Sequence, residues 1–365
     1  MWVGFAAYLG VLAAAPALGR RVVWVTIVLA VVAFAVAPVL LSHDVYSYLD
    51  YARLGVVHGL DPYVHPPLAA PADPAYADVA WTEATSAYGP LFTLATYPLA
   101  WLPVGTAIAA LKAVAALSVL GLAAVVARIA AWRGVDPLRA AAFVALNPLV
   151  LVHVVGGAHN DGLPMLLAML GVAAILSARE ASGGAALLAA VATKASALFI
   201  APFALVTQGS TGLKRPDGGR LRPVGQLLLG AALAAAVIAA AAYLAFGWDW
   251  LHAFELAGEN QGRTSYMSIP ITVARLSGLD PDAVRLLALV LFLTLLLQLL
   301  LWTWRGFDWI RAAGWTAVGL LLASSWLLPW YLVWPLPLAA VSRDRALQLL
   351  VLALTAYQLG ARIPL

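Results

Sequence analysis

The sequence predicts an all-α polytopic membrane protein, and its composition and apolar runs both support this fold class. Hydrophobic residues make up 64% of the 365 residues and charged residues only 10%, whereas soluble domains carry about a quarter charged residues. The runs 22–41, 226–246 and 286–304 approach the length of about 20 residues that a helix needs to cross a bilayer. Such runs recur along the whole chain, so we expect a single membrane domain over 1–365 with about twelve membrane helices.

Charge in the connections predicts the orientation of these helices. Cytoplasmic connections of membrane proteins are enriched in Lys and Arg. In our segmentation 14 of the 21 basic residues fall on one side, whereas 12 of the 17 acidic residues fall on the other. We therefore expect outer loops at 42–90 and 247–282 and a basic cytoplasmic loop at 209–225. Because the basic residues orient helices in this way, the net charge of +4 does not indicate a nucleic acid partner.

Two segments, 181–207 and 312–341, must leave and return on the cytoplasmic side to preserve this alternation. Each half is too short to cross a hydrocarbon core of about 30 Å at a rise of about 1.5 Å per residue. We therefore expect broken or re-entrant hairpins, with tips at Thr193-Lys194 and at 327–329. Non-helical backbone at membrane depth is tolerated where it lines a cavity or is buried in protein, so both tips point to a site.

The first outer loop contains the strongest candidate for chemistry. Helical spacing places Asp44, Tyr48 and Tyr51 on one face of a helix that follows an apolar run directly. A carboxylate at this position often only marks the end of a span. Here a polar aromatic helix follows it, and apolar neighbours would raise the pKa of Asp44 toward the range of a general base.

Several short motifs resemble those of the bacterial polyprenyl-phosphate-mannose-dependent α-(1→6)-mannosyltransferases of the GT-C superfamily. They occur in the same order with similar spacing and cover most of the chain from about 35 to 341. The motifs are Ser-His-Asp-Val-Tyr-Ser-Tyr at 42–48, Gly-Leu-Asp-Pro-Tyr at 59–63, Tyr-Gly-Pro-Leu at 88–91, Asn-Pro-Leu-Val at 147–150, Gly-Ala-His-Asn-Asp at 157–161, Ala-Thr-Lys-Ala-Ser-Ala-Leu at 192–198 and Pro-Trp-Tyr-Leu at 329–332.

The resemblance implies a GT-C-like helical bundle and an inverting transfer of mannose from polyprenyl-phosphate-mannose to a hydroxyl of a glycan or glycolipid acceptor, such as a lipomannan. It also implies Asp44 as the catalytic base, with Asp50 as the runner-up. Lys194 at a hairpin tip is the first candidate to stabilise the leaving phosphate, and Arg263 the second. Lys112, about two turns into its span, has the alternative of snorkelling outward.

The remaining candidate substrate-binding residues come from the outer loop, the 159–161 cluster and the second hairpin. His159, Asn160 and Asp161 would bind sugar or phosphate or position the base; a capping turn by Asn160 or Asp161 is the compatible alternative. The others are His43, Tyr48, Tyr88, Trp330 and Tyr331. We expect no metal and no other cofactor, because the chain has no cysteine and no zinc-type spacing.

Alternatives remain open at this point. In one alternative the donor sugar is arabinose or glucose, because sequence patterns do not distinguish sugars that differ by one hydroxyl group. A lipid-linked sugar flippase or transporter is another, although no internal repeat of span patterns is visible. A purely structural subunit would not need a charged residue at the depth of Lys194. We expect a multi-pass protein of the plasma membrane, in contact with its lipids, whose active site faces outward.

Overall fold

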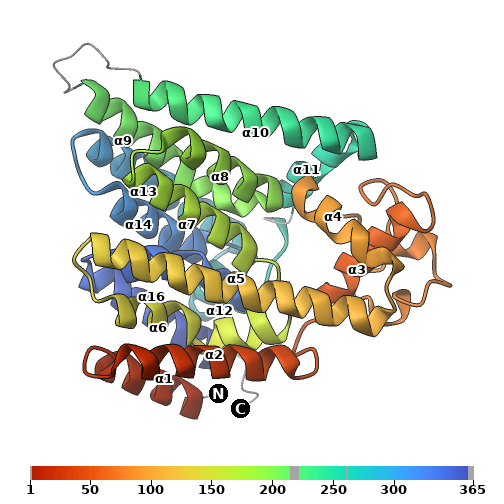
Figure 1. The fold of residues 1–365 in the computed structure, drawn as a ribbon, viewed down its shortest axis with the longest axis horizontal. Coiled ribbons are helices and arrows are strands. Elements are labelled where there is room, and N and C mark those ends of the chain that lie inside the picture. The colour runs from red at the N-terminus through yellow and green to blue at the C-terminus, as the bar shows by residue number, and fades with distance from the viewer. Residues whose placement is uncertain (1, 214–221, 260–261, 361–365) are drawn as a thin grey trace.

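The computed structural model describes residues 2–213, 222–259 and 262–360, and in these ranges the chain forms helices and no strand (Figure 1). The α-helices are α1 (Trp2–Ala14), α2 (Arg20–Val36), α3 (Asp44–Val56), α4 (Pro90–Thr96), α5 (Val104–Trp132), α6 (Pro137–Ala145), α7 (Gly162–Leu176), α8 (Glu180–Thr193), α9 (Ala201–Leu213), α10 (Arg222–Phe246), α11 (His252–Glu259), α12 (Ile269–Ser277), α13 (Pro281–Trp304), α14 (Trp309–Ala323), α15 (Pro335–Val341) and α16 (Arg345–Gly360). Shorter helical turns include η4 (Val150–Gly156), η5 (Ala195–Ile200) and η8 (Pro329–Val333).

Three long helices provide candidate membrane spans. The stretches Val104–Trp132, Pro223–Phe246 and Pro281–Trp304 are each long and apolar enough to cross a membrane, and α6 with η4 would make a fourth. Exposed side chains such as Leu244 and Leu291 give α10 and α13 apolar outer surfaces suited to lipid. These features support a helical membrane protein, while the count of about twelve helices stays a prediction.

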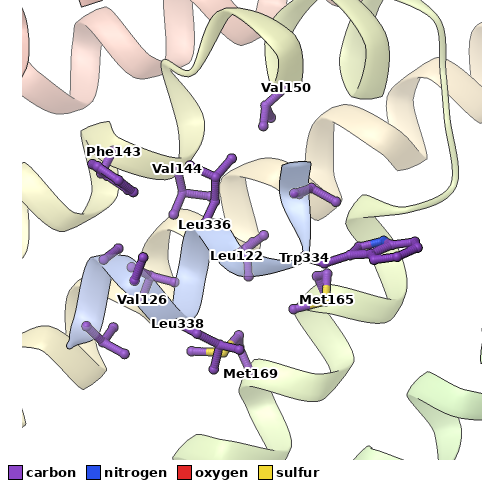
Figure 2. Close-up of a cluster of buried hydrophobic side chains, with 14 of the residues drawn as sticks. Leu122, Val126, Phe143, Val144, Val150, Met165, Met169, Trp334, Leu336 and Leu338 are labelled. Atoms are coloured by element: carbon purple, nitrogen blue, oxygen red, sulfur yellow. The ribbon is translucent and has the colours of Figure 1, made fainter. Parts of the chain in front are cut away.

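The core lies where α5, α6, α7 and α15 meet (Figure 2). Its buried side chains include Leu122, Val126, Phe143, Val144, Met165, Met169, Leu336 and Leu338. Glycines bring the neighbouring helices α8 and α10 into direct backbone contact, because a Cβ on Gly184 or Gly230 would overlap a carbonyl oxygen of the opposite helix. Close approach through small residues is typical of membrane helices. This contact holds α8, whose C-terminal end leads into the predicted first tip.

The first outer loop and α11 lie at one end of the long helices, and the α5–α6 connection lies at the other (Figure 1). Ion pairs of Arg133 with Asp308 and of Arg311 with Asp344 join helices at that second end. The 42–90 loop and the α5–α6 connection thus lie at opposite ends of the long helices, while the assignment of these ends to the two sides of a membrane stays a prediction.

Loop boundaries differ slightly from the predicted ones. Helix α9 continues to Leu213 and α10 begins at Arg222, so the predicted basic loop 209–225 includes parts of both helices, and its residues 214–221 lie outside the described residues. The second outer segment contains α11 and α12, and α13 already begins at Pro281.

The apolar region 138–155 does not form one straight helix. Helix α6 ends at Ala145, and the π-helical turn η4 follows at an angle of 63°. The reason lies at Asn147 and Pro148: proline has no N–H with which to continue the helix. The Asn147 side chain accepts a hydrogen bond from the Leu149 N–H at 3.0 Å instead. The bend directs η4 toward the segment that carries His159.

Both predicted hairpins contain helix breaks at their expected tips. Helix α8 ends at Thr193, and Lys194 has an extended backbone with φ −157° and ψ 124°. In the second hairpin α14 ends at Ala323, and the next helical turn begins only at Pro329. The depth of these breaks in a membrane stays a prediction.

Lys112 does not snorkel outward. Its side chain is buried, and the amine donates to the carbonyl oxygens of Ala37, Pro38 and Gly156, the last two at 3.1 Å. A lysine amine has three N–H donors, so these carbonyls use its full capacity. Lys112 therefore joins the end of α2 to the end of η4.

Candidate active site

A cavity of about 450 Å³ lies where the outer segments meet the two hairpin breaks. Its lining includes six residues that the sequence pattern singles out, namely Asp44, Tyr88, Lys194, Arg263, Trp330 and Tyr331. These residues come from five separate parts of the chain, so the fold brings together groups that the sequence alone does not place near one another.

Outer segments bind the backbone groups that the hairpin breaks leave free. The Gly89 N–H donates to the Thr193 carbonyl at 3.2 Å, directly before Lys194. In the second break, Ser265 donates its hydroxyl to the Leu327 carbonyl at 2.9 Å, and Ser268 donates to the Ser324 carbonyl at 2.9 Å. Buried backbone groups need such partners. The breaks and the outer segments therefore form one continuous cavity wall.

Asp44 occupies the first turn of α3, where the helix dipole favours a negative charge. One carboxylate oxygen, Oδ1, accepts a hydrogen bond from the Trp81 indole at 3.0 Å, and Oδ2 lies 3.5 Å from His159 Nδ1. Burial raises the pKa of Asp44, although the Trp81 hydrogen bond and the charge of Lys194 act in the opposite direction. A half-buried carboxylate with a raised pKa and an open path to a cavity has the properties of a general base.

An ion pair on the far side of α3 holds the first outer loop in place. Arg53 Nε donates to Asp73 at 2.7 Å, and His58 Nε2 lies 2.7 Å from the same carboxylate. Tyr51 donates its hydroxyl to the Ala84 carbonyl at 2.8 Å. These contacts close the loop over α3, which brings Trp81 back to Asp44 across 37 residues of chain.

Lys194 forms a buried ion pair beneath the cavity floor. Its amine lies 2.7 Å from Asp161 Oδ2 and donates to Asn160 Oδ1 at 3.3 Å. The other Asp161 oxygen accepts from the Trp334 indole at 3.0 Å. The Asp161 side chain is 0% exposed and that of Lys194 is 18% exposed, so the lysine is the member of the pair that reaches the cavity.

Aromatic rings form another wall of the cavity. Trp330 stacks on His159 with ring centroids 3.6 Å apart, and Tyr331 stacks on Trp334 at 4.2 Å. His159 lies buried behind Trp330 and 3.5 Å from the Asp44 carboxylate, while Trp330 itself lines the cavity. Aromatic faces of this kind stack on the apolar faces of sugars and pack against lipid chains.

Arg263 reaches the cavity from the second outer segment. Its guanidinium lies over the Trp81 ring, 5.3 Å from the ring centroid. Among the described residues we find no carboxylate that pairs with it. The Trp81 ring therefore contacts Arg263 through its face and the Asp44 carboxylate through its N–H.

Comparison with known proteins assigns the family. Residues 1–209, more than half of the chain, match the family described as "Alpha-(1->6)-mannopyranosyltransferase, N-terminal domain". The chain belongs to this family. The resemblance seen in the motifs is thereby confirmed.

Individual members of the α-(1→6)-mannopyranosyltransferase family align over most of the chain. Alpha-(1->6)-mannopyranosyltransferase A of Mycobacterium tuberculosis is 32% identical over 332 residues, which cover 83% of this chain and 63% of that protein. A probable alpha-(1->6)-mannopyranosyltransferase of Mycolicibacterium smegmatis is 28% identical over 364 residues, covering 86% of this chain and 64% of that protein. This chain thus spans somewhat less than two thirds of the length of these relatives.

In this member of the mannopyranosyltransferase family, two of the predicted site residues lie away from the cavity. His43 is exposed, and its Nδ1–H donates to the Asp78 carbonyl at 2.9 Å. Asp50 is buried at 1% exposure on another face of α3, because a separation of six residues leaves two helical side chains about 120° apart around the axis. In this arrangement neither side chain lines the cavity that Asp44 lines.

Three others lie directly behind the cavity wall. Tyr48 is buried and its hydroxyl accepts from the Asn160 N–H at 3.4 Å. Asp161 precedes α7, but its side chain makes no capping hydrogen bond. The capping alternative is therefore wrong for Asp161, because Lys194 and Trp334 already occupy its carboxylate. Asn160 likewise presents its side-chain oxygen to Lys194.

The sequence pattern misses Trp81 and the role of Trp334. Trp81 stands alone in an irregular loop, so no periodicity points to it. Trp334 belongs to an aromatic cluster that membrane proteins commonly place at an interface. Its hydrogen bond to Asp161 becomes apparent only when the two segments, 173 residues apart, are seen together. No group of three His, Asp or Glu side chains within the described ranges is placed to hold a metal ion.

Proposed function

We propose that this chain is an inverting glycosyltransferase that transfers mannose from polyprenyl-phosphate-mannose to a hydroxyl of a glycan or glycolipid acceptor. Relatives named as mannopyranosyltransferases support mannosyl transfer. The observation that carries the proposal is the shared cavity of Asp44, Lys194 and Arg263. It combines a carboxylate of raised pKa with cations, and this transfer needs both.

In the proposed reaction Asp44 accepts the proton of the acceptor hydroxyl. The oxygen attacks the anomeric carbon of mannose, and the bond to phosphate breaks with its electron pair leaving on the phosphate oxygen. The Trp81 N–H and His159 hold the carboxylate, so its free lone pairs face the cavity. Proton transfer to a positioned carboxylate contributes about 10²–10⁴-fold to rate.

The departing phosphate requires net positive charge, and we now put Arg263 before Lys194 as the candidate to supply it. Lys194 already pairs with Asp161, so the pair as a whole is neutral. Two of the three amine donors of Lys194 go to Asp161 and Asn160, which leaves one N–H for a phosphate oxygen. Arg263 lies over the Trp81 ring and has no carboxylate partner among the residues that the structure describes, so its guanidinium is available to bind phosphate through two parallel hydrogen bonds.

The decisive test compares wild-type protein with Asp44→Asn in lipid nanodiscs. Transfer to a short α-mannoside is assayed with polyprenyl-phosphate-mannose and, in parallel, with the arabinose and glucose donors. We expect transfer of mannose by the wild type, and donor binding without turnover by Asp44→Asn. Equal activity of both proteins would exclude Asp44 as the base. Binding of lipid-linked sugars without transfer by either protein would favour the flippase alternative.

We place the cavity on the outer face of the plasma membrane. The segregation of basic residues to the opposite end of the helices supports this orientation. Because the chain contains no cysteine, single cysteines introduced at the exposed positions Ala72 and Arg305 report the side directly. An impermeant thiol reagent applied to intact cells should label Ala72→Cys only; labelling of Arg305→Cys alone would reverse the orientation.

Metal independence is part of the proposal. A phosphate that is already esterified to one sugar leaves with the help of cationic side chains alone, which is the role we give to Arg263 and Lys194. Activity should therefore persist in excess chelator. Loss of activity that magnesium or manganese restores would contradict this part of the mechanism.

A further inference from the structure

A second cavity, of about 460 Å³, lies at the end of the bundle opposite Asp44. Its walls come from the α5–α6 connection, from residues 342–343 before α16, and from the first turn of α16. Helix α5 has 29 residues, so at about 1.5 Å per residue its ends lie roughly 43 Å apart. The second cavity is therefore separate from the proposed active site.

Three arginines converge on this cavity. Arg139, Arg343 and Arg345 line it together with Ser342 and Gln348, and its lining contains no carboxylate. Arginine side chains present planar, fixed sets of donors that match phosphate oxygens. The site thus combines concentrated positive charge with the geometry that phosphate recognition uses.

The acidic residues nearest to this cavity are already bound elsewhere. Asp136 accepts the Arg139 backbone N–H at 2.7 Å and so caps α6. Asp308 pairs with Arg133, and Asp344 accepts from Arg311 at 2.5 Å and from Trp315 at 2.8 Å. None of the ion pairs found among the described residues involves the three cavity arginines. Their charges therefore remain available to an external anion.

The backbone around the cavity is built to hold these side chains. Gly134 has a left-handed conformation with φ +67°, and a Cβ there would overlap the guanidinium of Arg343. The glycine thus leaves the room that this guanidinium fills. Gln348 donates to the carbonyl oxygens of Ala339 and Ser342 at 3.2 Å, which fixes the turn before α16. Arg343 within this turn and Arg345 directly after it are consequently held at the cavity edge.

We propose that this cavity binds a phosphate-bearing anion, namely the headgroup of an anionic lipid in the leaflet opposite the active site. The site lies at the basic end of the helices, where juxtamembrane arginines meet negatively charged headgroups. Its volume is many times that of a water molecule, which suits a headgroup larger than a hydrated ion. Free inorganic phosphate shares the same chemistry and is distinguished by experiment.

The test uses the full chain and two triple variants with the same change of charge. Arg139→Gln/Arg343→Gln/Arg345→Gln removes the cavity arginines. The matched control, Arg128→Gln/Arg179→Gln/Arg305→Gln, removes three arginines of the same end that do not line the cavity. The cavity arginines are exposed, so their loss removes no core packing, and melting in phosphatidylcholine nanodiscs verifies the fold.

Phosphatidylglycerol binding is measured by titration in detergent followed by native mass spectrometry. At about a fivefold loss for each arginine removed, the cavity variant should bind on the order of 100-fold more weakly, and the control far less so. Equal weakening in both variants would overturn the proposal, because the charges would then act only as a diffuse field.

Inorganic phosphate provides the second arm. Thermal stabilisation of the wild type but not of the cavity variant by phosphate, without any preference for phosphatidylglycerol, would identify free phosphate as the source of the anion. Absence of both lipid and phosphate effects would refute an anion site here. Neither result depends on sugar transfer at Asp44, so this proposal and the proposed function are tested separately.

Discussion

Removal of the Lys194 amine tests the buried ion pair beneath the cavity. In Lys194→Met the side chain keeps its approximate length but loses its charge, which leaves the carboxylate of Asp161 buried at 0% exposure. The Trp334 hydrogen bond at 3.0 Å becomes the main remaining compensation of that charge. Asp161→Asn makes the opposite change, and the introduced amide still accepts from Trp334.

The expected magnitudes follow from the separation and the burial of the two groups. Unit charges 2.7 Å apart attract by roughly 6 kcal/mol at an effective dielectric constant of about 20. Rehydration offsets part of this, so loss of one partner of a buried pair costs about 3–5 kcal/mol. We expect that range for Lys194→Met. Asp161→Asn should cost only about 1–2 kcal/mol, because the 18% exposed side chain of Lys194 hydrates in the cavity.

The assay is equilibrium unfolding in mixed micelles with increasing SDS, followed by tryptophan fluorescence. A double-mutant cycle adds Lys194→Met/Asp161→Asn. The loss of unfolding free energy in this double variant should be smaller than the sum of the losses in the two single variants by about 2 kcal/mol or more. Equal costs of the two single substitutions, or additivity within about 0.5 kcal/mol, would refute the description of Lys194 and Asp161 as a coupled buried pair.

Three further predictions concern the first outer loop. Trp81→Phe removes the hydrogen bond that holds the pKa of Asp44 down, so the acidic limb of the kcat/KM–pH profile should move to higher pH; an unchanged limb would contradict the contact. Burial, with the charge of Asp73, raises the pKa of Asp50 from 3.8 to about 7. A raised folded-state pKa makes stability fall as pH increases, so the wild type should lose stability between pH 3.8 and about 7. Asp50→Asn should lose less stability over this range. An equal change of melting temperature with pH in the two proteins would argue against this burial. Gly89→Ala places a Cβ against a backbone carbonyl of α8, so overpacking should lower the free energy of unfolding by about 1–3 kcal/mol. The control Gly105→Ala has open space around the new Cβ and should not lower it. Unfolding in SDS measures both changes.

The helical membrane architecture and the hairpin breaks are predictable from local features of the sequence. Apolar runs and the distribution of arginine can be recognised within single segments. The two hairpin segments have too few residues to cross a membrane twice, which predicts a break in each. The bend at Asn147 is less accessible, because Asn-Pro within an apolar run is compatible with a straight kinked span. The 63° turn becomes definite only through the side-chain contacts of Asn147 with Leu149 and Thr355.

The candidate site is predictable where a charged side chain occurs in an apolar part of the sequence. Asp44 and Lys194 are charged groups next to apolar or broken segments. Because a charge is costly to bury in such surroundings, both residues stand out in the sequence. The partners of these groups are not predictable in the same way. Trp81 reaches Asp44 only after the irregular loop has closed on Asp73, and Asp161 is paired with Lys194 only through the packing of separate helices. Asp50 shows the reverse error, since a carboxylate near Asp44 in the sequence need not share its helix face.

The three carbonyl contacts of Lys112 amount to a tethered ion. The ammonium is coordinated by oxygens much as a bound metal would be, yet its covalent stem prevents it from dissociating or exchanging with the medium. Two of these oxygens, of Ala37 and Pro38, begin the segment that leads to Asp44, and that of Gly156 begins the one that leads to His159. The relative position of the Asp44 and His159 segments therefore does not depend on a bound ion that the medium could exchange.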